Sequence, residues 1–244
     1  MLYFLVLVIG VLPSLLWLIF YLRKDVHPEP KRLILEIFLY GMLAGFFVIF
    51  LGKLAKIPAE LLKKSGFPFL SAVFYWFLGV ALIEEFLKYW VVKNKILRHP
   101  EFDEPTDAMV YMITAGLGFA ALENVLIFFR ELFPEEILLF SEEILILLLI
   151  RFLSGTFLHA LCAGVVGYFL ALWKFLGKTK IQIFYGLTLA VLLHGIYDFS
   201  IMEIENEKLR IFVPLFVLIF LGVIVSFFFE RLRKVSKRNY DKIL

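Results

Sequence analysis

The chain has 244 residues, of which 62% are hydrophobic and only 19% are charged, and its mean hydropathy is +0.91. Soluble domains carry about 25% charged and 45–50% apolar residues, so this composition excludes an ordinary soluble protein. The formal net charge of +3 is too small to indicate a nucleic-acid partner. A single cysteine, Cys162, excludes an internal disulfide and a CxxC metal site.

Hydrophobic runs recur at about the 20-residue length that a helix needs to cross roughly 30 Å of hydrocarbon. The seven predicted spans are residues 2–22, 33–51, 69–91, 107–129, 143–173, 183–202 and 211–229. All are expected to be helical, because open strands cannot cross lipid with unpaired edges. The sequence thus predicts an all-α, polytopic membrane bundle, with one transmembrane domain over residues 1–230 and a basic cytoplasmic tail over residues 231–244.

Lysine and arginine predict the orientation, because basic residues favour cytoplasmic connections. The first, third and fifth connections and the C-terminal tail are basic, whereas the fourth and sixth connections are acidic. We therefore expect the N-terminus outside and the C-terminus in the cytoplasm. The segment Gly52–Gly66 disagrees, since it carries four lysines but has to lie outside. Either this segment forms an amphipathic interfacial helix, or the second span does not cross completely.

Polar residues interrupt the third to sixth spans. A charge at the bilayer centre costs about 2.5–3.5 kcal/mol even on the lenient insertion scale, so ionisable residues at this depth are functional-site candidates that face a protein interior or a wet cavity. A polar network that only holds helices together is the alternative. The candidates are Glu84, Glu85, Lys88, Glu123, Asn124, Arg151, His159, His194 and Asp198.

Helical spacing places several of these residues together. Lys88 follows Glu84 by four residues and Glu85 by three, so it lies on their side of the helix as a charge partner. His194 and Asp198 are four residues apart, which lets the carboxylate orient the ring and hold its proton.

A second pattern predicts close packing around a histidine. In the fifth span, small and polar residues recur every four positions, which suits close helix contact beside a buried imidazole. They are Arg151, Gly155, His159, Ala163 and Gly167.

Depth in the membrane is a test that the set has to pass. At about 1.5 Å per residue, Glu123, His159 and His194 lie roughly 20–24 Å from the cytoplasmic ends of their spans. The Glu84–Glu85 pair reaches about 20 Å only if the third helix continues from Val91 to Leu97. We therefore predict a long third helix and a site in the outer half of the membrane.

Adjacent carboxylates offer a base and an acid at once, as the attack of water on an amide requires. A histidine or Asn124 could donate to the developing oxyanion. The same glutamates and histidines could instead bind a divalent metal such as zinc that activates the water, and the sequence does not separate the two versions. It contains neither HExxH nor GxSxG, so the standard zinc and serine protease motifs are absent.

Four blocks in register resemble the PrsW family of glutamic-type intramembrane proteases, which is distantly similar to CAAX prenyl proteases and bacteriocin-immunity membrane proteins. The blocks are "EEFLK" (Glu84–Lys88), "FDEPTDAMVYMITAGLGFAALEN" (Phe102–Asn124), "RFLSGTFLHALCAGVVGY" (Arg151–Tyr168) and "LHGIYDF" (Leu193–Phe199). One departure is Asp107-Ala108, where the family often has DG.

The resemblance implies a multi-pass protease of a prokaryotic cell membrane that cuts a membrane-anchored, anti-sigma-factor-like substrate on its extracytoplasmic side. It implies that Glu84 and Glu85 are the catalytic pair, and that His159 and His194 are the family's two histidines. Glu123 and Asn124 match its EN motif. Lys88, Arg151 and Asp198 are expected to support this site or its substrate.

Carboxylate and histidine chains also serve as proton relays, so a proton-coupled transporter or channel is the first alternative. A non-catalytic membrane scaffold or immunity protein is the second. In every case the lipid bilayer is an expected partner and nucleic acid is not.

Overall fold

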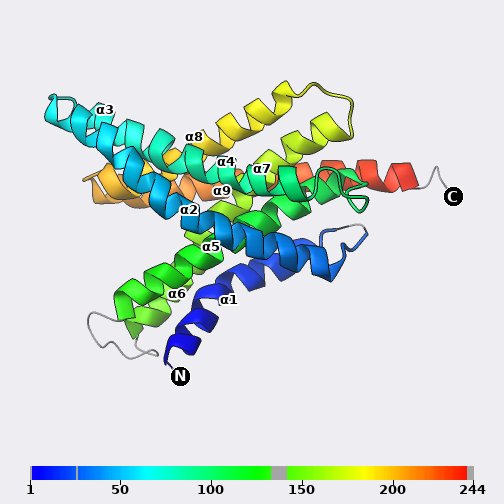
Figure 1. Cartoon of the computed structure of the whole chain (residues 1–244), viewed down its shortest axis with the longest axis horizontal. Coiled ribbons are helices and arrows are strands. Elements are labelled where there is room, and N and C mark those ends of the chain that lie inside the picture. Colours follow the sequence, from blue (N-terminus) through cyan, green and yellow to red (C-terminus); the bar gives the residue numbers. More distant parts are fainter. Residues whose placement is uncertain (1, 26, 133–141, 241–244) are drawn as a thin grey trace.

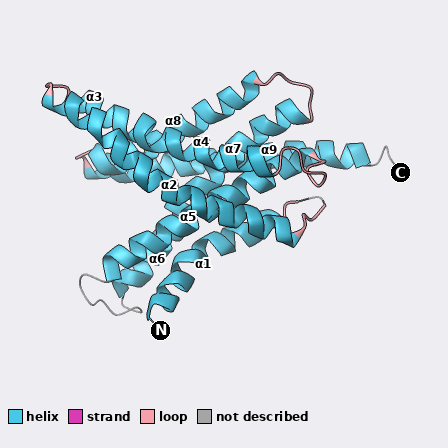
Figure 2. Cartoon of the chain, viewed as in Figure 1, coloured by secondary structure: helices cyan, strands magenta, loops and turns pink. Residues whose placement is uncertain are grey.

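The computed structural model describes residues 2–25, 27–132 and 142–240. Figure 1 shows helices that fan out from a common crossing region, and Figure 2 shows that only short loops join them. Within the described ranges there is no strand, and seven helical segments are long and apolar enough to span a membrane. The predicted all-α, seven-span architecture is therefore confirmed.

Most helices extend past the predicted spans. The first, fourth, sixth and seventh spans are α1 (Leu2–Leu22), α5 (Pro105–Leu132), α8 (Ile181–Glu203) and α9 (Glu207–Tyr240). Helix α9 therefore continues through most of the basic tail predicted at residues 231–244. Leu232 is fully buried, and the Arg231 guanidinium donates to the Tyr168 hydroxyl at 2.6 Å. The beginning of the tail packs on the bundle; residues 241–244 lie outside the described residues.

The second span corrects an expectation about Gly52–Gly66. Helix α2 (Lys31–Lys64) runs without interruption through this segment, which is therefore not a separate interfacial helix. At about 1.5 Å per residue its length is roughly 51 Å, more than hydrocarbon alone requires. Gly66 ends the helix with φ +87°, the left-handed conformation that favours glycine after a helix, and the chain then turns into the next segment.

The third span is built from three helical pieces: α3 (Pro68–Val73), the π-helix η1 (Phe74–Ala81) and α4 (Leu82–Lys95). The predicted extension past Val91 is present, and it ends at Lys95, two residues before Leu97. The π-helix was not predicted. It ends immediately before the turn that carries Glu84 and Glu85, and π-turns are frequent at functional sites.

The fifth span is divided, which the sequence did not predict. Helix α6 (Glu142–Leu153) ends at Ser154, whose φ of −121° and ψ of −87° break the regular spacing, and α7 (Gly155–Lys174) follows. A Cβ on Gly155 would lie 2.4 Å from a guanidinium nitrogen of Arg151. The missing side chain therefore makes room for Arg151 to fold back over the start of α7.

Helix α5 lies at the centre of the bundle, because 78% of its apolar window is buried, compared with 28–39% for the other spans. It contacts α1, α2, α4, α7 and α9. A Cβ on Gly118 would lie 2.0 Å from the Phe38 carbonyl oxygen, and one on Gly116 would lie 2.8 Å from the His159 carbonyl oxygen. Helices α2 and α7 thus pack directly on the backbone of α5.

Candidate active site

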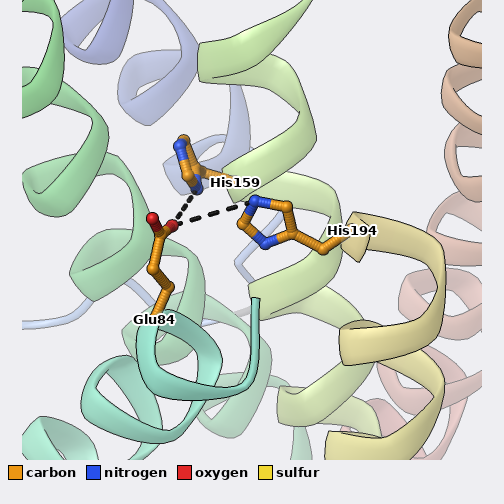
Figure 3. A group of neighbouring side chains, drawn as sticks. All are labelled: Glu84, His159 and His194. Atoms are coloured by element: carbon orange, nitrogen blue, oxygen red, sulfur yellow. Dashed lines mark ion pairs between the residues drawn. The ribbon is translucent and has the colours of Figure 1, made fainter. Parts of the chain in front are cut away.

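Glu84 faces two imidazoles in the interior of the bundle (Figure 3). It lies in the first turn of α4, whereas His159 comes from α7 and His194 from α8. Glu84 Oε2 is 3.9 Å from His159 Nδ1 and 3.8 Å from His194 Nε2. This oxygen is buried and has no hydrogen-bond partner among the described residues. It is therefore available to a water, a metal ion or a substrate group.

Glu85 has a different environment although it is the next residue. The Lys88 ammonium donates to Glu85 Oε1 at 2.6 Å, and His194 Nδ1 lies 2.8 Å from the same oxygen. Glu85 and Lys88 are both fully buried, so each charge depends on the other for compensation. The predicted Glu–Lys ion pair is present, and Glu85 holds one face of His194.

The far nitrogen of His159 contacts a second polar group. His159 Nε2 is 2.8 Å from Glu123 Oε2, which also accepts a 2.6 Å hydrogen bond from Arg151 Nη2. Arg151 Nε donates to Asn124 Oδ1 at 2.7 Å, and Asn124 Nδ2 donates to Thr156 Oγ1 at 2.9 Å. The EN pair of α5 therefore anchors Arg151 and, through Glu123, one face of His159.

Lys88 lies between Glu85 and His159. Its ammonium is 2.8 Å from His159 Nδ1 and 4.6 Å from the centre of the Phe119 ring. Because an ammonium can only donate, this contact leaves the His159 proton on Nε2, where it is donated to Glu123. Asp198 Oδ2 is 3.3 Å from His194 Nε2, as the four-residue spacing predicted.

All nine residues singled out in the sequence lie in this one network, and the predicted convergence of the third to sixth spans is confirmed. Phe119 and Thr156 were missed, although each has a signal: Phe119 lies four residues before Glu123, and Thr156 three before His159. Neither side chain is ionisable, so neither carries the cost of a charge in the membrane that marked the other candidates. The network is most exposed at Glu123, whose side chain is 37% exposed, whereas Glu85 and Lys88 are fully enclosed.

The donor set fits a divalent metal. One glutamate and two histidines form a known zinc set, and their ligand atoms all lie within 4.8 Å of one another. Each imidazole turns one nitrogen toward Glu84 and the other toward a carboxylate, Glu123 or Glu85, as metal-binding histidines do. The Lys88 ammonium contacts the same Nδ1 of His159, so metal and lysine would compete for that nitrogen.

Comparison with known proteins gives a consistent result. A family model described as PrsW family intramembrane metalloprotease matches residues 29–225. A Protease PrsW from Geobacillus kaustophilus is 30% identical over 230 residues, which cover 93% of this chain and 89% of that protein. One from Oceanobacillus iheyensis is 31% identical, with 87% and 89% covered, and one from Bacillus subtilis is 28% identical, with 81% and 83% covered.

No solved structure matches the chain. The family match spans most of the chain and includes every residue of the network described above. The chain therefore belongs to the PrsW family, and it is an intramembrane protease of bacterial membranes that acts on a protein substrate.

Proposed function

We propose that this protease hydrolyses a peptide bond of a membrane-anchored protein with a water molecule activated by Glu84. The observation that carries the proposal is the buried Oε2 of Glu84, which faces two imidazoles and has no hydrogen-bond partner among the described residues. A carboxylate in this position can take a proton from water held between it and the histidines. Glu85 also has a buried Oε2 without a hydrogen-bond partner among the described residues, but it is less suited to this role, because Lys88 and His194 engage its Oε1 and the residue is fully enclosed.

The other residues have positioning and polarising roles in this proposal. His194 is held at Nδ1 by Glu85, and its Nε2 lies 3.3 Å from Asp198, so we assign it the polarising role in which the Nε2 proton turns from Asp198 to the carbonyl oxygen as negative charge develops there. The amide of Asn124 is committed to Arg151 and Thr156, so we assign it a positioning role and not the oxyanion contact considered from the sequence. Arg151 and Glu123 hold the Nε2 side of His159.

A metal-assisted version uses the same residues. Glu84, His159 and His194 would hold the ion, and zinc when bound would polarise the carbonyl and make water a stronger nucleophile. The description of the family as intramembrane metalloproteases supports this version. Glu84 is essential in both.

The substrate we propose is a single-span protein of the anti-sigma-factor type, cut near the extracytoplasmic side. The resemblance and the depth of the network counted along the helices support this proposal. The side of the network at Glu123 and Asp198, whose side chains are 37% and 21% exposed, is the one on which an unwound substrate segment would enter.

The test is Glu84→Gln, which keeps the shape of the side chain and removes the base. Co-expressed with a tagged single-span anti-sigma factor, the variant should cleave about 10²–10⁴-fold more slowly than the parent, which is the usual contribution of a general base. The matched control is Glu205→Gln, an exposed glutamate between α8 and α9, which should leave the rate unchanged. Undiminished cleavage by Glu84→Gln would refute the proposal. Loss of parent activity in chelator, restored by zinc, would select the metal-assisted version.

A further inference from the structure

Four carboxylates outside the active site gather where the α1–α2 connection meets the α4–α5 connection. Asp25, Glu104 and Asp107 each place a carboxylate oxygen within 4.8 Å of the others. The carboxyl group of Glu29 faces that of Asp107. We call these four residues the loop carboxylate cluster. In Figure 1 both connections lie on the same side of the molecule as the C-terminus.

Two members of the cluster are enclosed by the protein. Glu104 and Asp107 are 8% and 0% exposed. Asp107 Oδ2 accepts the backbone N–H groups of Asp103 and Glu104 at 3.0 and 2.8 Å, whereas no donor reaches its buried Oδ1 among the described residues. Among the described residues, neither Glu29, Glu104 nor Asp107 forms an ion pair with a lysine or arginine. Glu104 Oε2 lies 2.8 Å from His27 Nδ1.

Surrounding groups orient the carboxylates toward one another. The Tyr111 hydroxyl donates to Glu29, and the Thr106 hydroxyl donates to Glu104 Oε1 at 2.5 Å. Buried carboxylates are normally paired with a base or coordinate a metal, and among the described residues neither Glu29, Glu104 nor Asp107 has a lysine or arginine partner.

We propose that the loop carboxylate cluster binds a hard divalent cation, Mg²⁺ or Ca²⁺, through Asp25, Glu104 and Asp107. All the donors are carboxylate oxygens, which these two cations prefer, whereas zinc prefers nitrogen and sulfur. The orphan Oδ1 of Asp107 is the oxygen that most needs such a partner. The supporting hydrogen bonds from Thr106 and His27 are of the kind that hold ligating carboxylates in place.

This site is separate from the active site. Asp107 and Glu123 lie on the same helix, sixteen residues apart, which is about 24 Å along α5. The cation would hold the α1–α2 connection and the α4–α5 connection against the first turn of α5, the central helix. Its role is therefore structural: it holds the helices that carry Glu84 and Glu123 in register.

The experiment uses the purified full-length protein in detergent, stripped with chelator and carrying Glu84→Gln to weaken the metal set of the active site. Thermal unfolding is followed by tryptophan fluorescence while Mg²⁺ or Ca²⁺ is added in separate arms. A cation at about 100 times its dissociation constant should raise the Tm by roughly 5–10 °C. The arm with the larger response identifies the cation.

The variants Asp107→Asn and Glu104→Gln should lose this rise in Tm. The matched control Glu101→Gln, an exposed carboxylate in the same connection, should keep it. A Tm that neither cation changes would overturn the proposal, as would an Asp107→Asn variant that responds like its parent. An Asp107→Asn variant that is more stable than its parent in chelator, and whose Tm does not respond to either cation, would also overturn it. A proton shared between carboxylates would then explain the cluster.

Should Asp107→Asn fail to fold, Glu104→Gln decides the question by direct binding. Manganese, an oxygen-preferring substitute for both cations, is counted by electron paramagnetic resonance. One ion per chain in the Glu84→Gln parent, absent in the Glu104→Gln variant, supports the site. Equal manganese binding by the two proteins contradicts it.

Discussion

Two adjacent glutamates of identical chemistry have opposite surroundings in this protein. Residues i and i+1 of a helix point about 100° apart, so Glu84 Oε2 lies 3.7–3.9 Å from Lys88 and two imidazoles without a hydrogen bond among the described residues, while Glu85 Oε1 is hydrogen-bonded to Lys88 and His194. The first arrangement suits chemistry and the second suits support. We therefore propose that Glu84 is the reactive carboxylate of the pair and that Glu85 supports the site.

Lys88 is expected to be a principal stabilising residue of the site. Replacing it by methionine leaves Glu85 buried without its ammonium, and breaking a buried pair in this way typically costs about 3–5 kcal/mol. We expect Lys88→Met to lower the free energy of unfolding by this amount, measured by denaturation in mixed micelles.

A double-mutant cycle is the control for that prediction. Adding Glu85→Gln to Lys88→Met removes the orphaned charge, so the double variant should be more stable than Lys88→Met alone. Strictly additive losses from the two substitutions would show that the pair is not coupled, and would contradict the role given to Lys88.

At the scale of the elements, local irregularities position the site. The π-helix η1 leads directly into the turn of Glu84 and Glu85, and the break at Ser154 lets Arg151 fold back over Gly155. Between these elements, α2 and α7 pack directly against the backbone of α5 at Gly118 and Gly116. This close approach brings Glu123 and Asn124 within reach of residues on α6 and α7.

The glycines of α5 are expected to tolerate no side chain. In Gly118→Ala the new Cβ would lie 2.0 Å from the Phe38 carbonyl oxygen, so the helices have to separate. Overpacking of this kind costs about 1–3 kcal/mol or more, and should appear as a lower Tm and reduced cleavage. The matched control is Gly52→Ala in α2, where nothing lies within 4 Å; it should be neutral or stabilising by up to about 1 kcal/mol. Equal Tm values for the two variants would contradict the packing argument.

At the scale of the whole molecule, the basic connections other than the segment Gly52–Gly66 lie at one end. The connections before α2, after α4 and after α7 lie on the same side as the C-terminus, and the turn at Gly66 lies on the opposite side (Figure 1). Basic connections favour the cytoplasm, so we predict a cytoplasmic C-terminus and an N-terminus outside. The loop carboxylate cluster would then face the cytoplasm.

Fusions test this orientation. Green fluorescent protein should fluoresce when joined to the C-terminus, and alkaline phosphatase inserted after Gly66 should be active, because each reporter works on only one side of the membrane. The reverse pattern would show that the four lysines between Gly52 and Gly66 outweigh the other connections, and would place cleavage near the opposite face.

Hydropathy and spacing in the sequence were enough to predict the class of protein, the seven spans and the candidate residues that the fold brings together. Hydropathy over 20 residues is a local property, and the cost of Glu84 or His194 in lipid can be recognised without knowing what either contacts. The fold was needed to show that Glu84 faces both imidazoles while Lys88 and His194 bind Glu85, that Asn124 is committed to Thr156, and that Asp25 lies near Asp107. These features depend on the rotation of each helix about its axis and on contacts between residues far apart in the chain, which spacing within one span does not reveal.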